Sequence, residues 1–171
     1  MKNLTPKGFT LIETLVAIAV LTITLVGPLS TANIALQASR TSQDQLTASY
    51  LAEEGIEFVH SRHDDNFTPD IHVHGFPGPY LDECVDGIVC SIDVLNRTMT
   101  PCDSNQCTPL YLDANNHYSQ DSAGTPTIFT RSVSLSHSGD ILFVSVVVSW
   151  TEGGNTHSVT LQDTLQNYSS L

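Results

Sequence analysis

A long apolar run near the start of the chain limits what it can fold into more than any other feature. Residues 9–29 are 21 consecutive residues with a single charge, Glu13. At 1.5 Å per residue, a helix over this run is about 31 Å long, close to the hydrocarbon thickness of a bilayer. Lys2 and Lys7, the only lysines, both precede the run, so the positive-inside tendency keeps residues 1–8 in the cytoplasm. We therefore expect one membrane span followed by an exported domain.

A secretory signal peptide and a plain single-span anchor are two interpretations of this run. Pro28 interrupts helical hydrogen bonding near its end, and Ser30-Thr31-Ala32 offers a small-x-small site for a signal peptidase. Against a signal peptide, the run exceeds the usual apolar core of roughly 7–15 residues, and an acid inside such a core is unexpected. A plain anchor would tolerate Glu13 because a carboxylate near a helix N-terminus gains about 0.3–1 kcal/mol.

The residues around Gly8 favour a third interpretation. The basic leader MKNLTPKG is followed directly by FTLIE. From Lys2 to Leu21 the sequence resembles the leader and cleavage motif of type IV pilins and pseudopilins. The resemblance implies cleavage after Gly8 by prepilin peptidase, a membrane aspartic peptidase, and methylation of the new amino terminus at Phe9. Weaker similarities in YLAEEGIEFV, PLYLD and FTRSVS indicate a minor pilin.

This resemblance gives Glu13 a partner. A carboxylate costs roughly 2.5–3.5 kcal/mol at the middle of a membrane on insertion scales, and less near its edge. Cleavage after Gly8 creates a cationic α-amino group on Phe9. In a filament, Glu13 of one subunit would meet Phe9 of its neighbour and fix the axial register of the subunits. The resemblance thus implies that Gly8 and Phe9 are processing residues and that Phe9 and Glu13 are assembly residues.

The resemblance also implies where the protein goes and what it meets. Before assembly the chain would stand in the bacterial inner membrane, in contact with lipid, with its C-terminal domain outside. Its partners would be prepilin peptidase, other pilin subunits and the inner-membrane assembly platform, and its destination an extracellular or periplasmic filament. A pseudopilin of a type II secretion or DNA-uptake system is the alternative within the family.

The helix is expected to continue beyond the membrane. Residues 30–62 contain no proline, their only glycine is Gly55, and strong helix formers are common among them. An apolar stripe at helical period indicates an amphipathic helix that packs on a sheet. The stripe consists of Ala48, Ala52, Ile56 and Val59. We expect one helix from Phe9 to about Arg62, with a kink or loosened turn before Pro28.

Residues 63–171 are expected to form a β-rich globular head. Apolar and polar residues alternate in 131–136, 141–150 and 156–162, and short turns separate these segments, which predicts an antiparallel meander. Within it, Val133, Leu135, Val159 and Leu161 are expected to be buried. Residues 64–80 and 113–126 are expected to be loops. The predicted fold class is α+β, with a cleaved leader (1–8), a membrane or filament-core helix (9–29), its amphipathic continuation (30–62) and the head.

Four cysteines lie in the exported part of the chain: Cys84, Cys90, Cys102 and Cys107. An even count in an oxidising compartment indicates two disulfides. The short spacings favour the pairs 84–90 and 102–107, and a turn at residues 85–87 would bring the first pair within bridging distance. The two other pairings stay open, and a tetrahedral zinc site of four cysteines is a further alternative.

A histidine-rich segment follows the predicted helix. It contains His60, His63, His72 and His74, beside Asp64, Asp65 and Asp70. This density of imidazoles and carboxylates could hold a transition metal, and the simpler interpretation is a polar loop with histidines near the negative end of a helix. A membrane-tethered or secreted binding domain with a metal loop is therefore the alternative function of another class.

Charge and motifs exclude several functions. Asp and Glu number 18 against six Lys and Arg, and this acidic balance argues against nucleic acid as a direct partner. The sequence has no G-x-S-x-G, phosphate-loop or His-Glu-x-x-His motif, so we expect neither an enzyme nor a cofactor. Loss of residues 1–8 removes both lysines and leaves four bases against 18 acids, a net charge of −14.

Overall fold

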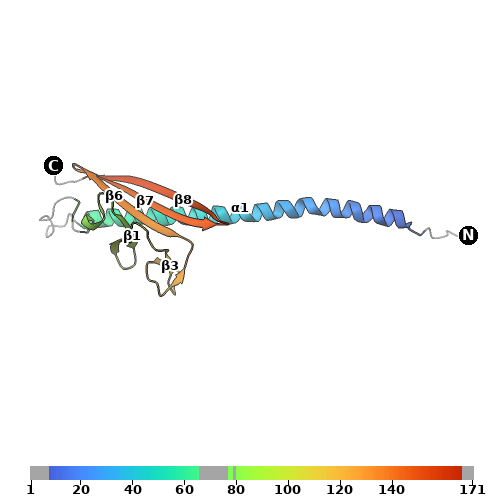
Figure 1. The fold of residues 1–171 in the computed structure, drawn as a ribbon, viewed down its shortest axis with the longest axis horizontal. Coiled ribbons are helices and arrows are strands. Elements are labelled where there is room, and N and C mark those ends of the chain that lie inside the picture. The colour runs from blue at the N-terminus through green and yellow to red at the C-terminus, as the bar shows by residue number, and fades with distance from the viewer. Residues whose placement is uncertain (1–7, 66–76, 79, 167–171) are drawn as a thin grey trace, which may run out of the picture. The chain divides into compact units, whose positions relative to one another are not determined.

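The structure is a computed structural model that describes residues 8–65, 77–78 and 80–166 (Figure 1). The chain divides into two units, residues 1–43 and 44–171, which are described separately. Helix α1 (Leu11–Asp65) contributes residues to both units, and all strands belong to the second. One long N-terminal helix and antiparallel sheets confirm the predicted α+β class.

In the first unit, α1 begins at Leu11, two residues after the predicted start, and it continues through Pro28. The carbonyl of Thr10 accepts hydrogen bonds from the N–H groups of Glu13 (3.1 Å) and Thr14 (3.3 Å), which closes the first turn. Threonine hydroxyls along the helix donate back to carbonyls three or four residues earlier, as Thr22 does to Ala19 at 2.8 Å. Their polar groups are thus satisfied without water.

In the second unit, α1 buries one stripe of its surface and ends at Asp65. Asp64 and Asp65, predicted as the start of a loop, are its last two residues. Acids are unfavourable at this end of a helix, and Arg62 (3.5 Å) and Arg97 (2.7 Å) offset the charge of Asp65. Of the predicted stripe, Ala48, Ala52 and Val59 are buried and Ile56 is partly buried. A glycine within this stripe brings helix and sheet close together. A Cβ on Gly55 would lie 2.8 Å from Val146 Cγ1.

The main sheet has five antiparallel strands in the order β2-β1-β6-β7-β8 (Figure 1). Their bounds are Val89–Asp93 (β1), Thr98–Pro101 (β2), Thr130–Ser138 (β6), Ile141–Glu152 (β7) and Asn155–Gln166 (β8). The alternation in β6 and β7 is confirmed, since Val133, Leu135, Val144, Val146, Val148 and Trp150 are buried. Val159 and Leu161 of β8, predicted as buried, are only partly buried because β8 is the edge strand, and Leu165 is the buried residue of this strand.

A second, small sheet has the order β4-β3-β5, with β3 (Tyr111–Leu112), β4 (Tyr118–Ser119) and β5 (Thr125–Pro126). The prediction that residues 113–126 form only a loop was wrong, because they include β4 and β5. Strands of two residues show no alternation, so the sequence gives no pattern from which to predict them. A short 3₁₀ helix, η1 (Asp82–Cys84), precedes β1.

A buried arginine joins three elements of the second unit. Arg131 of β6 is fully buried, and its guanidinium donates to the Leu51 carbonyl (3.1 Å), the Glu54 carboxylate and the Ile92 carbonyl (3.2 Å). Its contacts therefore tie α1, β6 and β1 together. A guanidinium taken out of water needs such partners, because an uncompensated buried charge is strongly destabilising.

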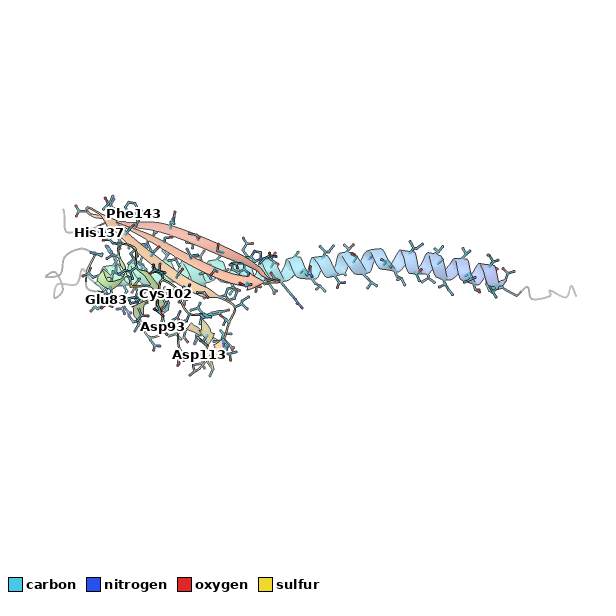
Figure 2. The ribbon with its side chains drawn as sticks, in the orientation of Figure 1. Glu83, Asp93, Cys102, Asp113, His137 and Phe143 are labelled. Atoms are coloured by element: carbon cyan, nitrogen blue, oxygen red, sulfur yellow. A yellow bond between two sulfur atoms is a disulfide. The ribbon has the colours of Figure 1, made fainter. Side chains whose placement is uncertain are left out.

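Asp93 at the end of β1 is a second polar junction (Figure 2). Its buried carboxylate accepts hydrogen bonds from the backbone and side-chain N–H groups of Asn96 (3.0 Å each) and from the backbone N–H of Gln120 (3.0 Å). Burial acts to raise the pKa of Asp93, but these donors outweigh it and hold the pKa below its ordinary value. The carboxylate thus fastens the segment after β4 to the end of β1.

We predict that Glu54→Ala lowers the free energy of unfolding by about 1.5–3 kcal/mol, because Arg131 loses its charged partner. Trp150, the only tryptophan and 4% exposed, allows the measurement by fluorescence during chemical denaturation of the full chain. Glu53→Ala, an exposed neighbour, is the control and should change the value by less than about 0.5 kcal/mol. In an Arg131→Met background the effect of Glu54→Ala should shrink. An undiminished effect in that background would contradict the pairing.

Asp93→Asn is predicted to destabilise the chain at pH 6 and to cost much less at pH 3. A carboxyl with a lowered folded-state pKa contributes stability above its unfolded pKa of about 4 and loses it as pH falls through the folded value. The same fluorescence titration at both pH values tests this. Asp82→Asn, at an exposed position, is the matched control. An Asp93→Asn cost that is equal at the two pH values would refute the role of the ionised carboxylate.

Candidate assembly site and polar clusters

The residues predicted to carry processing and assembly lie at the start of the described chain. Gly8, Phe9 and Thr10 precede α1 and are exposed, with Phe9 82% exposed. Glu13 lies in the first turn of α1 and is also exposed. Within residues 8–65, 77–78 and 80–166, no ion pair involves Glu13. Its carboxylate is thus accessible to a cation supplied by another molecule.

An uncovered apolar surface follows Glu13. Every residue from 8 to 40 is exposed, and the large apolar side chains among them are more than half exposed, including Leu11 (77%) and Ile23 (75%). By length and composition, α1 contains a segment able to cross a membrane. Soluble proteins seldom expose a continuous apolar surface of this extent, so lipid or other chains must cover it.

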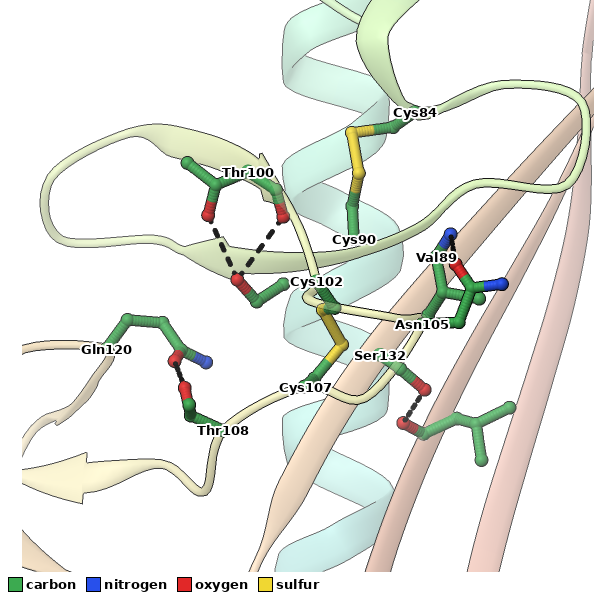
Figure 3. The surroundings of a disulfide bond; sticks show 12 residues. Cys84, Val89, Cys90, Thr100, Cys102, Asn105, Cys107, Thr108, Gln120 and Ser132 are labelled. Atoms are coloured by element: carbon green, nitrogen blue, oxygen red, sulfur yellow. Dashed lines mark hydrogen bonds between the residues drawn. A yellow bond between two sulfur atoms is a disulfide. The ribbon is translucent and has the colours of Figure 1, made fainter.

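The four cysteines form two local disulfides in the second unit (Figure 3). Cys84 pairs with Cys90 (Cα–Cα 5.8 Å) and Cys102 with Cys107 (4.8 Å), which are the pairs that the spacing favoured. Gly87 has a positive φ of 98° in the turn that brings the first pair together. Because all four cysteines are used in disulfides, the zinc alternative is excluded.

The bridged loop 102–107 is attached to the start of β1. The backbone N–H of Cys102 donates to the Val89 carbonyl at 2.8 Å. The Val89 N–H donates to the Asn105 side-chain oxygen at 3.2 Å, as Figure 3 shows. These disulfides therefore support the fold of the second unit and present no free thiol for chemistry.

The structure describes two of the four predicted histidines, and both line one cavity beside β8. His60 pairs with Asp163 of β8 (Nε2 to Oδ2, 2.7 Å), while His63 is buried beside Asp64 (Nδ1 to Oδ1, 3.6 Å). Burial lowers the pKa of His63, against the opposing effect of Asp64. The remaining candidates, His72, His74 and Asp70, lie outside the described residues. Within the part of the chain that the structure describes, no three His, Cys, Asp or Glu side chains have the placement of a metal site.

The pairing of His60 with Asp163 is a contact that the sequence analysis missed. The two residues are 103 positions apart, and no local pattern links them. The N–H of Thr164 (2.7 Å) and then His60 lower the pKa of Asp163. Arg131 was missed for a related reason, since its place on the buried face follows from the alternation with Val133 and Leu135, but its charge argued for the surface.

Comparison with known proteins identifies the N-terminal segment. The family described as "Prokaryotic N-terminal methylation motif" matches residues 5–27. No curated protein and no solved structure matches the chain. The motif implies processing by prepilin peptidase and assembly with pilins, and with the apolar helix it agrees with inner-membrane anchoring before assembly. The chain thus carries the N-terminal methylation motif of type IV pilins and pseudopilins at residues 5–27, and its long N-terminal helix with a C-terminal antiparallel sheet is consistent with a pilin-like α+β fold.

Proposed function

We propose that the chain is a minor-pilin-like structural subunit of a type IV pilus or a related filament. Prepilin peptidase cuts it after Gly8 and methylates the amino group of Phe9. The observation that supports this most directly is the methylation motif at residues 5–27, which overlaps a helix whose residues 11–40 are all exposed. In this proposal residues 1–8 are the leader, 9–29 the membrane and filament-core helix, 30–62 its amphipathic continuation and 63–171 the globular head.

The apolar surface has to be covered both before and after assembly. Covering a Leu, Ile or Val side chain that water would otherwise contact gains about 1.5–3 kcal/mol. In the membrane, lipid covers residues 9–29, and in the filament the same residues of neighbouring subunits do so. Van der Waals packing and polar contacts then decide between the two states, because lipid tails are as apolar as leucine.

Glu13 makes the polar contact that favours one axial arrangement of neighbouring subunits over the others. The α-amino group that cleavage creates on Phe9 stays cationic after methylation, so it can neutralise Glu13 of the adjacent subunit. A carboxylate that meets no cation in an apolar surrounding is costly, and a shifted arrangement of subunits would leave Glu13 in that state. The pair therefore fixes the axial position of one helix against the next.

The first prediction from this proposal concerns the N-terminus. Mass spectrometry of the membrane-extracted protein from its own host should find a peptide that begins at Phe9 with a methylated amine. A peptide that begins at Asn33 would indicate a signal peptidase cut and a secreted domain. A chain that retains Met1 through Gly8 would indicate a plain anchor. Either of the last two results would refute the proposal.

The second prediction concerns Glu13. Glu13→Ala should lower the amount of assembled filament about tenfold or more, because each subunit contact loses a charged pair of about 1.5–3 kcal/mol. Membrane level and cleavage after Gly8 should be unchanged, and both are checked by blotting of the membrane fraction. Glu53→Ala, an exposed acid of the same helix, is the matched control and should assemble normally. Normal assembly of Glu13→Ala would favour a membrane-tethered binding domain instead.

A further inference from the structure

The end of α1 and the end of β8 enclose a polar cavity of about 400 Å³. Four of the side chains that line it are ionisable: His60, His63 and Asp64 of α1 and Asp163 of β8. β8 is an edge strand of the main sheet and pairs with β7. Contacts across this cavity therefore decide how firmly the end of β8 is held against α1.

His60 makes the contact across the cavity. Its Nε2 lies 2.7 Å from Oδ2 of Asp163, and the two side chains are 35% and 41% exposed. The Thr164 N–H donates to the other oxygen of this carboxylate at 2.7 Å. The Thr164 N–H and then His60 lower the pKa of Asp163, so the carboxylate stays ionised at any pH between 5 and 8. We call the contact of His60 with Asp163 the latch.

His63 lies one helical turn after His60 and is only 1% exposed. A proton on its ring would place a positive charge where water is excluded, close to a second histidine. Burial therefore lowers the pKa of His63, with a smaller contribution from His60 and against the effect of Asp64. Asp64 compensates weakly, because its oxygen is 3.6 Å from Nδ1 of His63 and its side chain is 78% exposed. Asp65, which contacts Arg62 and Arg97, does not line the cavity.

We propose that this junction is acid-sensitive: a proton on His63 loosens the last turns of α1 and thereby opens the latch to the end of β8. A buried imidazolium reaches water when the end of α1 moves away from the sheet. His60 is on the same side of the helix, so this movement lengthens its contact with Asp163. The inference concerns the head and does not depend on filament assembly.

The direction of the pH dependence follows from proton binding. A solvent-exposed histidine in the open state has a pKa of about 6.5, and that of His63 in the closed state is lower. The closed junction is thus fully stable above pH 6.5 and loses stability as the pH falls from there towards the folded-state pKa. Between pH 7.5 and pH 5.5 the open fraction can rise at most about tenfold, the limit that an open-state pKa of about 6.5 sets.

Hydrogen exchange of the full chain in detergent micelles tests the inference. Protection of the slowly exchanging amides in residues 58–65 and 160–166 is measured by mass spectrometry at pH 7.5 and pH 5.5, after correction for the intrinsic exchange rate at each pH. We expect the open fraction of both segments to rise about three- to tenfold at pH 5.5, while residues 130–138 of β6 keep their protection. Equal protection of both segments at the two pH values would overturn the inference.

Three variants assign the response to residues. His63→Gln should remove the response in both segments, because it removes the proton site. Asp163→Asn should open residues 160–166 at both pH values and leave the response of residues 58–65 intact. His117→Gln is the matched control, because His117 is also paired with an aspartate (Asp113, 3.3 Å) but lies 59% exposed outside the cavity, and it should leave both responses unchanged.

The outcomes are decisive for His63. A folded His63→Gln chain that keeps the response, or a His117→Gln chain that loses it, would overturn His63 as the sensor. If His63→Gln does not fold, NMR titration of the histidine rings in the unmodified chain decides, because the His63 ring must titrate over the pH range in which the junction opens. A chain that begins at a methylated Phe9 is compatible with either result, so failure of this inference leaves the proposed function intact.

Discussion

Everything else in this molecule depends on how the apolar surface of α1 between Phe9 and Leu29 is kept from water. Its large side chains are more than half exposed, and its threonine hydroxyls bond to carbonyls of the helix itself. Apart from the Glu13 carboxylate, which needs a cation, this part of the helix thus needs no hydrogen-bonding solvent and can lie in an apolar surrounding. In residues 44–65 the same helix is amphipathic. One narrow stripe of its surface is buried, and the opposite side carries exposed acids.

The part of the fold that could be predicted from the sequence is the part encoded by local periodicity. Alternation in β6 and β7 and the stripe around Ala52 each repeat often enough to show which side of the element is buried. The strands β4 and β5 could not be predicted, because two residues contain no period and their pairing depends on residues in β3. Arg131 shows the other limit, since its burial depends on carbonyls and a carboxylate contributed by distant parts of the chain.

The residues of the candidate site also differ in whether the sequence alone identifies them. Gly8, Phe9 and Glu13 form a contiguous motif, so the sequence alone identifies them, and the family comparison covers them within residues 5–27. The histidine-rich segment is also contiguous, and its described members His60 and His63 lie near each other but pair with different carboxylates. Residues three apart on a helix share one side, so His60 and His63 both line the cavity beside β8, where His60 reaches Asp163 and His63 is buried.

The two disulfides link residues only six and five positions apart. Such small rings can close while the chain is still being exported, since their cysteines meet without help from the long-range sheet. The order of oxidation and folding then matters little, and an exported chain can be oxidised correctly before β7 and β8 have crossed the membrane. For the same reason the bridges remove little freedom from the unfolded chain as a whole, because the entropy lost grows with the length of the ring. They make the region around β1 rigid and leave the long strands to rely on their own packing.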